Sequence, residues 1–297
     1  MRVVMTGATS GIGLEAAKRL VARPDVTLIV GARHPDKLPP SLSGKVTALP
    51  LDLADLNSVR HFADAVLATG PIDVLVGNGG MQTNVPERSA QGYERTFAVN
   101  HLAHYLLARR LIDSIGQAGR IILTSNGTHD PEQETGMPAP RHADAQRLAF
   151  PDRDPELDVK PGLAGRRAYS TSKLCNVMTV RELARRSAHR HDLSIMAFDP
   201  GFVPGTGLAR SYGPFADWLF RNVLPVVIRG GHVSSAPISG DALAGLATDQ
   251  RYAGGRGLYW SMDHRRPILR EPSALARNDA ACAALWDDSA GLVGISV

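Results

Sequence analysis

A glycine-rich turn near the start of the chain reads Thr6-Gly7-Ala8-Thr9-Ser10-Gly11-Ile12-Gly13. An apolar run at residues 2–6 precedes this turn, and a helical pattern that begins at residue 11 follows it. Glycines at 7, 11 and 13 permit a tight turn, close backbone approach to a pyrophosphate, and close packing of helix on strand. The whole turn, with Thr9, Ser10 and Ile12, is therefore predicted to bind nucleotide phosphates at the helix N-terminus. An ordinary turn is the alternative, and the strand-to-helix context disfavours it.

Short apolar runs alternate with amphipathic stretches along the rest of the chain. Strands are predicted at residues 2–6, 26–31, 45–50, 72–77, 120–125, 193–198 and 257–260, and helical patterns at 11–22, 56–68, 92–115 and 170–188. Buried strands separated by helices are typical of parallel βαβ units. The sequence thus predicts a single α/β domain over residues 1–297, with a doubly wound, Rossmann-like parallel sheet of about seven strands.

Composition excludes several classes of protein. Of 297 residues, 43% are hydrophobic, enough for a large core, and the formal net charge of +4 comes from scattered basic residues. Nucleic acid is therefore not an expected partner. The two cysteines and the histidine pairs lack the spacing of a metal site, so no metal is expected. Because no apolar run reaches the roughly 18 residues that span a bilayer and no signal peptide pattern precedes the first strand, we expect a soluble cytoplasmic protein.

Polar or small residues follow three further predicted strands. Arg33 follows the second strand, where an acidic residue is typical of NAD-selective chains and an arginine suits the 2′-phosphate of NADP. Asp52, next to Leu53, follows the third strand, where a carboxylate can accept from an adenine amino group. The fourth strand ends in Asn78-Gly79-Gly80, a turn of small residues against which a cofactor can lie. The sequence therefore favours NADP(H), with a solvated loop arginine as the alternative interpretation of Arg33.

A second motif, Tyr169-Ser170-Thr171-Ser172-Lys173, is predicted to form the first exposed turn of a helix. Residues four apart share a helix face, so the phenol and the ammonium point into the same space. The reference pKa of a phenol is about 10, and the ammonium is expected to lower the pKa of Tyr169 so that it exchanges protons near neutral pH. The pair predicts an acid/base device, with a solvated helix face as the alternative.

Together, these motifs resemble the short-chain dehydrogenase/reductase family over essentially the whole chain. The likeness rests on the glycine turn, Asn78-Gly79-Gly80, Asn100 within Val99-Asn100-His101-Leu102, the Tyr169/Lys173 pair and Asp199-Pro200-Gly201. Residues 169–176, 206–208 and 257–261 and the tail around Trp286 resemble a narrower branch, which holds retinol dehydrogenases and light-dependent protochlorophyllide reductases.

The resemblance implies a role for each of these residues. Tyr169 would protonate a carbonyl oxygen while NADPH delivers hydride to the carbonyl carbon. Lys173 would hold the nicotinamide ribose and lower the pKa of Tyr169. Asn100 would hold a water in a proton relay. The nicotinamide would be lined by one short segment that includes Pro200, Gly201, Val203 and Thr206.

Two positions depart from the family pattern. The fifth strand of the family usually closes with two serines, the second of which orients the substrate carbonyl, whereas this chain has Ser125 followed by Asn126. An amide can still donate to a carbonyl oxygen, so Asn126 is predicted to take this role, with Ser125 as the alternative donor. Phe202 stands where protochlorophyllide reductases carry a cysteine, which disfavours light-driven chlorophyll chemistry.

Two long segments are predicted to flank the site. Residues 128–167 are rich in Pro, Asp and Arg and are interpreted as a loop insertion over the rim of the active site. Residues 205–228 carry aromatic side chains at helix-like spacing and are interpreted as a substrate lid, with core packing as an equally weighted alternative. Either interpretation favours a bulky apolar substrate.

We therefore expect an NADP(H)-dependent oxidoreductase that acts on a small hydrophobic carbonyl or alcohol substrate. One alternative is an NADP-binding sensor or scaffold in which the change at Asn126 has reduced or removed catalysis. Another is a C=C reductase of the protochlorophyllide type. A sugar-nucleotide epimerase is disfavoured because the glycine spacing differs from the Gly-x-x-Gly-x-x-Gly common in such enzymes. The sequence leaves open the substrate, the reaction direction and whether the chain forms a homo-oligomer.

Overall fold

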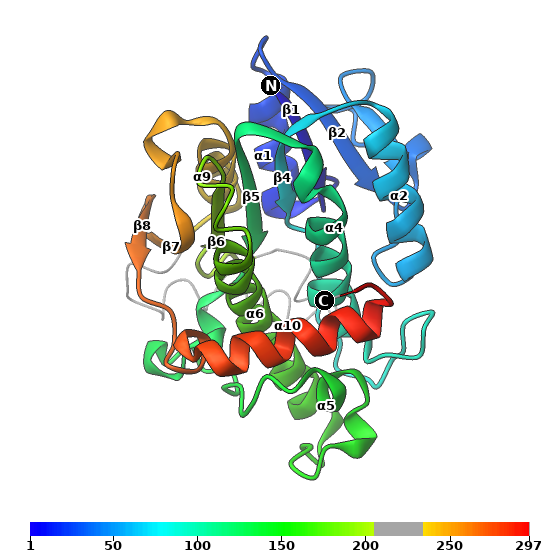
Figure 1. Cartoon of the computed structure of the whole chain (residues 1–297), viewed down its shortest axis with the longest axis vertical. Helices are drawn as coiled ribbons and strands as arrows, with labels where there is room; N and C mark the ends of the chain where they lie inside the picture. The colour runs from blue at the N-terminus through cyan, green and yellow to red at the C-terminus, as the bar shows by residue number, and fades with distance from the viewer. Residues whose placement is uncertain (205–233, 297) are drawn as a thin grey trace.

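Eight strands form one sheet in the computed structural model, which describes residues 1–204 and 234–296 (Figure 1). Their order across the sheet is β3 (Thr47–Pro50), β2 (Thr27–Ala32), β1 (Arg2–Thr6), β4 (Ile72–Gly77), β5 (Ile115–Thr124), β6 (Ser194–Asp199), β7 (Arg256–Asp263) and β8 (Arg266–Arg270). All neighbours are parallel except β7 and β8. The strand order changes direction between β1 and β4, where sheets of this kind bind ligands at the carboxyl ends of the strands.

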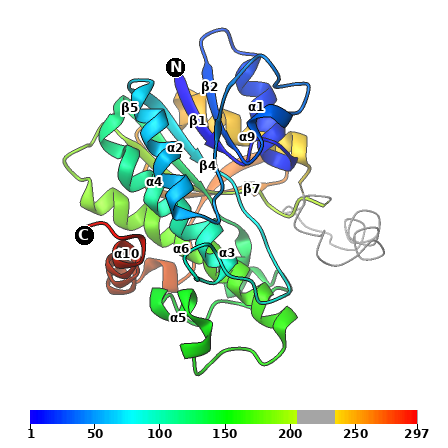
Figure 2. The same cartoon turned by 90° about the vertical axis from the view of Figure 1, so that its right-hand side faces the viewer.

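Helices cover both faces of the sheet (Figure 2). One face is covered by α2 (Leu56–Ala68), α4 (Ala103–Leu111) and α6 (Pro161–Arg186), and the other by α1 (Gly11–Val21) and α9 (Ala236–Thr248). The C-terminal helix α10 (Asp279–Val293) packs on the outer side of α6 and α4. Alternate strand residues fill the two cores: Val4 and Leu75 belong to the first, and Val3 and Met5 to the second. The predicted doubly wound α/β fold is confirmed.

The other helical elements of the described residues are short. They are α3 (Arg95–Phe97), α5 (Ala145–Ala149), the π-helical turn η2 (Ala98–Leu102) and the 3₁₀ turns η1 (Pro35–Lys37), η3 (Ile112–Ser114), η4 (Gly127–His129), η5 (Pro131–Gln133), η6 (Pro151–Arg153), η8 (Gln250–Tyr252) and η9 (Leu275–Arg277). Several lie within residues 128–167, which were predicted as a loop insertion and in fact contain ordered helical turns.

Strand β8 was not predicted from the sequence. It is antiparallel to β7 and forms the edge of the sheet. Its residues read Arg-Pro-Ile-Leu-Arg, and proline and charged residues weaken a strand signal in sequence. An edge strand tolerates both, because one side of it needs no hydrogen-bonded partner.

Helix α6 begins earlier than the sequence suggested. Tyr169 was predicted in a first exposed turn, but the helix starts at Pro161 and Tyr169 lies buried in its interior. Proline is favoured at the first helical position because its missing N–H has no partner there in any case. The sequence signal for this start was therefore Pro161 itself.

Two further predictions concern a substrate lid and membrane-spanning helices. The predicted lid at 205–228, with Thr206, lies outside the described residues. None of the helices in the described part of the chain is both long and apolar enough to cross a membrane.

The glycine turn brings the ends of β1 and β4 into contact. Gly7 and Gly11 have φ angles of +67° and +55°, which favour glycine. A Cβ atom on Gly7 would lie 2.6 Å from Gly79 Cα, and one on Gly13 would collide with the carbonyl oxygen of Gly7. The predicted packing role of these glycines thus has a structural basis.

We predict that Gly13→Ala lowers the free energy of unfolding by about 2 kcal/mol or more, because overpacking against a fixed backbone atom cannot relax easily. Gly162→Ala is the matched control, since a Cβ there would have no atom within 4 Å, and alanine is the better helix former. Urea unfolding of the two variants measures the difference. Equal stability of both would contradict the prediction.

Candidate active site

Hydrogen bonds join the carboxyl ends of β1, β4 and β5. The Thr6 hydroxyl oxygen accepts from the backbone N–H groups of Asn78 at 3.0 Å and Gly79 at 2.9 Å. The Asn78 amide donates to the carbonyl oxygen of Gly7 at 3.2 Å, and the Thr124 hydroxyl donates to Asn78 Oδ1 at 3.2 Å. The glycine turn and the Asn78-Gly79-Gly80 turn therefore lie together, because β1 and β4 are neighbours in the sheet.

Tyr169 and Lys173 lie on one face of α6, directed at the same strand ends. The Lys173 ammonium lies 5.5 Å from the centroid of the Tyr169 ring and donates to the carbonyl oxygen of Thr124 at 3.2 Å. Only 5% of Tyr169 and 4% of Lys173 is exposed. The prediction that the two side chains share one space is in agreement with this geometry.

The pKa of Tyr169 does not follow the sequence prediction. Burial raises the pKa of the phenol, and the nearby Asp199 carboxylate raises it further. Burial also lowers the pKa of Lys173 to about 8, although Asp199 opposes that change. The prediction that the pKa of Tyr169 is lowered is therefore wrong for the protein without a bound cofactor. Desolvation of the phenol outweighs its attraction to the Lys173 ammonium, which is itself desolvated. The phenol is neutral near pH 7, so it can donate a proton.

Asn100 is fully buried within the π-helical turn η2. Its Oδ1 atom accepts from the Met81 N–H at 2.8 Å, and its amide donates to the Met81 carbonyl and to Ser172 Oγ, each at 2.9 Å. The Ser172 hydroxyl in turn donates to the carbonyl oxygen of Tyr169 at 2.7 Å. Both amide hydrogens of Asn100 are used within the protein, and each of its two oxygen atoms already accepts one hydrogen bond, so the second lone pair of each oxygen is what remains for the predicted water contact.

Ser125 and Asn126 differ in what they can donate. Ser125 is buried, and its hydroxyl donates to the carbonyl oxygen of Lys173 at 2.8 Å, so this hydrogen is already in use. Asn126 Oδ1 accepts from the Thr128 N–H at 3.0 Å and caps η4, while its amide nitrogen donates to none of the residues that the structure describes. Of the two predicted donors, Asn126 is therefore the one with free hydrogens.

The other predicted cofactor residues lie along the same edge. Arg33, directly after β2, is exposed and pairs with no carboxylate in residues 1–204 or 234–296. Asp52 is exposed, but one of its carboxylate oxygens already accepts from the Ala54 N–H at 2.9 Å. Ser10 is the N-cap of α1, yet its hydroxyl makes no capping bond. Among the remaining predicted residues, five are exposed or partly exposed: Thr9, Gly11, Ile12, Leu53 and Gly80. Three are buried: Pro200, Gly201 and Val203.

Comparison with known proteins identifies the family. The model of the short chain dehydrogenase family matches residues 1–135. Protochlorophyllide reductase A of Oryza sativa subsp. japonica is 32% identical over 317 residues, which cover 99% of this chain and 80% of that relative. The chain belongs to the short-chain dehydrogenase/reductase family. It is therefore an oxidoreductase, and its relatives include further protochlorophyllide reductases, such as that of Arabidopsis thaliana at 31% identity over 99% of this chain and 77% of the relative.

Solved structures support the fold of this short-chain dehydrogenase/reductase. An uncharacterized protein from Mycobacterium paratuberculosis has a TM-score of 0.70 at 28% identity, over 99% of this chain and 94% of the other. A short chain dehydrogenase from Burkholderia cenocepacia, solved in complex with NADP, has a TM-score of 0.63 at 21% identity, over 89% and 96% of the two chains. The predicted membership of the family and of its protochlorophyllide reductase branch is confirmed.

Asp199, for which the sequence predicted no role, lies buried at the end of β6. Its carboxylate accepts from the Ser261 hydroxyl at 2.8 Å, the Tyr259 hydroxyl at 3.2 Å and the Gly201 N–H at 2.8 Å. These bonds fix the start of the segment predicted to line the nicotinamide, and the charge acts on both Tyr169 and Lys173. Two motifs, Asp199-Pro200-Gly201 at the end of β6 and Tyr259-Trp260-Ser261 within β7, were the available signal in the sequence.

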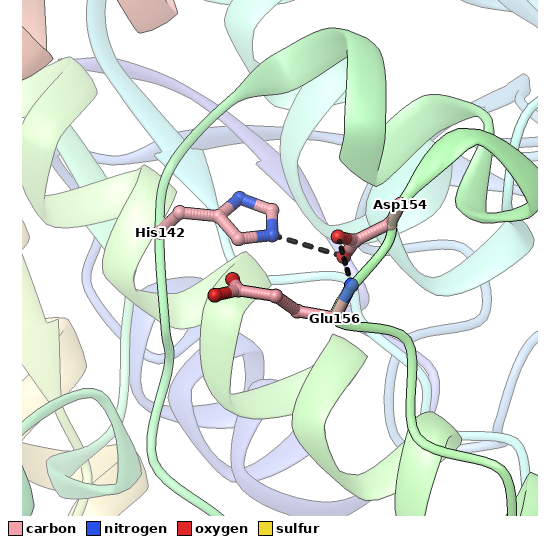
Figure 3. Close-up of side chains that lie close together, drawn as sticks. All are labelled: His142, Asp154 and Glu156. Carbon is pink, nitrogen blue, oxygen red and sulfur yellow. Dashed lines mark hydrogen bonds and ion pairs between the residues drawn. The ribbon is translucent and has the colours of Figure 1, made fainter.

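One cluster of potential metal ligands lies in the 128–167 segment (Figure 3). The ligand atoms of His142, Asp154 and Glu156 lie within 4.8 Å of one another. Arg147 already pairs with both carboxylates. Although burial opposes it, hydrogen bonds from Arg147, the Glu156 N–H and His142 lower the pKa of Asp154 to about 2. We interpret the cluster as an ion-pair group that holds this segment together.

We predict a pH signature of the buried Lys173 ammonium. Below pH 8, Lys173 is charged in both the folded and the unfolded state, so burial of the ammonium lowers the free energy of unfolding by its full amount. Between about 8, the folded pKa, and the ordinary value of 10.5, the folded state loses its proton before the unfolded state does. The free energy of unfolding of the wild type should therefore rise, relative to Lys173→Met, by roughly 3 kcal/mol over this range. Urea unfolding at several pH values measures it, and a constant difference would contradict it.

Proposed function

We propose that this chain is an NADP(H)-dependent carbonyl reductase or alcohol dehydrogenase with a hydrophobic substrate. The observation that carries the proposal is the buried, neutral Tyr169 phenol beside the Lys173 ammonium, at the strand ends where the turns of β1 and β4 meet. The bound cofactor would supply a hydride to the carbonyl carbon, and the chain would supply the proton.

The residues at the strand ends fit a dinucleotide phosphate. The turn that contains Gly7, Gly11 and Gly13 leads directly into the N-terminus of α1, where the Ser10 hydroxyl makes no capping bond, so this hydroxyl and the first N–H groups of the helix would donate to the phosphates. Arg33 would bind the 2′-phosphate, since its guanidinium is exposed next to β2. Similar structures solved in complex with NADP or NADPH lend support to this cofactor.

Tyr169 and Asn126 would act on the substrate oxygen. In the reduction, the Tyr169 phenol gives its proton to the carbonyl oxygen as the hydride reaches the carbon, which leaves an alcohol and a phenolate. Lys173 stabilises this phenolate because its ammonium lies within 5.5 Å of the ring centroid. The free amide of Asn126 would donate to the same oxygen. Because burial raises the pKa of Tyr169, reduction is favoured near neutral pH, and alcohol oxidation would need a phenolate formed at high pH.

A second candidate is the reduction of a C=C bond of the protochlorophyllide type. Family members that carry this name at 30–32% identity over nearly the whole chain favour it. The presence of Phe202, where those enzymes were expected to carry cysteine, counts against a light-driven reaction. Incubation of the protein with protochlorophyllide and NADPH, in darkness and in light, separates this candidate from carbonyl reduction. Tight NADPH binding without turnover of any substrate would instead indicate a sensor or scaffold.

We predict that Tyr169→Phe lowers kcat for a hydrophobic aldehyde or ketone by about a hundredfold to ten-thousandfold, because a general acid contributes roughly that much. NADPH affinity should stay within a few fold, since the ring remains. Tyr93→Phe is the matched control, because the Tyr93 hydroxyl donates to the Leu292 carbonyl in another part of the fold. Steady-state kinetics with saturating NADPH measure the effect, and unchanged turnover in Tyr169→Phe would show that another group is the acid.

We predict that NADPH binds at least tenfold more tightly than NADH, a preference of about 1.4 kcal/mol. Arg33→Asp should remove most of this preference, because the carboxylate repels the 2′-phosphate. Arg265→Asp is the control, since Arg265 is also exposed and unpaired in the described structure but lies in the β7–β8 turn. Fluorescence titration with both cofactors measures the dissociation constants. Equal values for the two cofactors in the wild type would refute the assignment.

A further inference from the structure

His104 lies on α4, and its imidazole reaches from the active site to the end of β1. Only 1% of the residue is exposed. Its Nδ1 atom lies 3.0 Å from the backbone carbonyl oxygen of Asn100, and its Nε2 atom lies 2.9 Å from the Thr6 hydroxyl oxygen. One side chain therefore bridges the π-helical turn of Asn100 and the strand that leads into the glycine turn.

The partners of His104 fix the polarity of each bond. A carbonyl oxygen can only accept, so the proton of the ring is on Nδ1 and is donated to Asn100. Burial lowers the pKa of His104 to about 4, and the charge of Lys173 acts in the same direction, so the ring is neutral near pH 7. Nε2 is then an acceptor, and the Thr6 hydroxyl must donate to it. The Thr6 oxygen keeps its lone pairs for the N–H groups of Asn78 and Gly79.

The sheet leaves space for this ring. A Cβ atom on Gly77, the last residue of β4, would lie 2.9 Å from His104 Cδ2. The imidazole therefore packs directly against the β4 backbone, where another side chain would exclude it. Packing against β4 and the two hydrogen bonds of the ring together hold the imidazole between the strand ends and Asn100.

We propose that His104 is a positioning residue, which couples the turns that hold the cofactor to the residues that hold the proton donor. Its bond to Thr6 fixes the Asn78-Gly79 turn, and its bond to Asn100 fixes the residue that Ser172 links to the Tyr169 backbone. Without the ring, the two halves of the site can shift against each other. A misplacement of about 1 Å between reacting groups can lower a rate about a hundredfold. This inference rests on the proposed function.

The test compares His104→Phe with His104→Gln in the full-length protein, with NADPH saturating and a hydrophobic aldehyde or ketone as substrate. Phenylalanine keeps a ring and loses both hydrogen bonds, whereas a neutral amide keeps one donor and one acceptor. Counted per NADPH-binding site, kcat should fall about tenfold to hundredfold in His104→Phe, with the NADPH dissociation constant within a few fold of wild type. His104→Gln should recover most of this loss with an unchanged pH profile.

His101→Phe is the matched control. His101 is also a buried histidine next to Asn100, but its ring bonds to Ser289 of α10 and not to the strand ends. This variant should lose stability and keep kcat per binding site. If His104→Phe behaves in the same way, His104 is merely structural and the proposal is wrong. If His104→Gln is as slow as His104→Phe and its pH profile changes, His104 transfers protons, which also overturns the proposal.

Hydrogen exchange provides a readout that does not need turnover. The N–H groups of Asn78 and Gly79 bond to the Thr6 oxygen, so their exchange should accelerate in His104→Phe and stay near the wild-type rate in His104→Gln. Equal exchange in all three proteins would overturn the inference on its own. Absence of wild-type turnover with every substrate would instead count against the proposed function, and the exchange result would still decide the role of His104.

Discussion

Burial of the Lys173 ammonium at the carboxyl edge of the sheet sets the conditions for the rest of the site. A charge in this position needs nearby oxygen atoms, and it has the Thr124 carbonyl at 3.2 Å and the electrostatic attraction of Asp199. Burial of Tyr169 itself raises the pKa of its phenol, and the Asp199 charge raises it further, so the phenol stays protonated. Burial against the strand ends therefore acts in opposite directions on the pKa values of the lysine and the tyrosine.

Hydrogen bonds from neighbouring residues hold the backbone that carries Tyr169 and Lys173. Asn100 and Ser172 connect Met81 to the backbone of Tyr169, and Ser125 donates to the backbone of Lys173. On the outer side of the same helices, Tyr105 of α4 donates to the Trp286 carbonyl of α10 at 2.9 Å. The Arg186 guanidinium of α6 also donates to the Asp287 carboxylate of α10 at 2.7 Å. Side-chain positions are better defined when neighbouring bonds hold each rotamer, and α6 is held from the sheet side and from the C-terminal helix.

The sequence predicted the fold and the main pair because both depend on local patterns. The glycine spacing, the alternation of strands and helices, and the four-residue interval between Tyr169 and Lys173 are each readable without tertiary structure. The sequence did not predict three features of the structure. They are the start of α6 at Pro161, the raised pKa of Tyr169, and the hydrogen bond from the Ser125 hydroxyl to the Lys173 carbonyl oxygen. The Tyr169 pKa and the Ser125 bond depend on which face of α6 is buried against the strand ends, and helical spacing alone does not specify that face. The bridge made by His104 joins residues far apart in sequence and had no local signal.

We propose that hydride moves from NADPH to a carbonyl carbon while the protein protonates the oxygen. Transfer of deuterium tests it most directly: the protein is incubated with NADPH deuterated at the reactive nicotinamide carbon and with a panel of hydrophobic aldehydes and ketones, and the products are analysed by mass spectrometry. We expect an alcohol with one deuterium on the former carbonyl carbon. Bound NADPH that keeps its deuterium with every carbonyl substrate, or deuterium found only on a carbon of a reduced C=C bond, would contradict it.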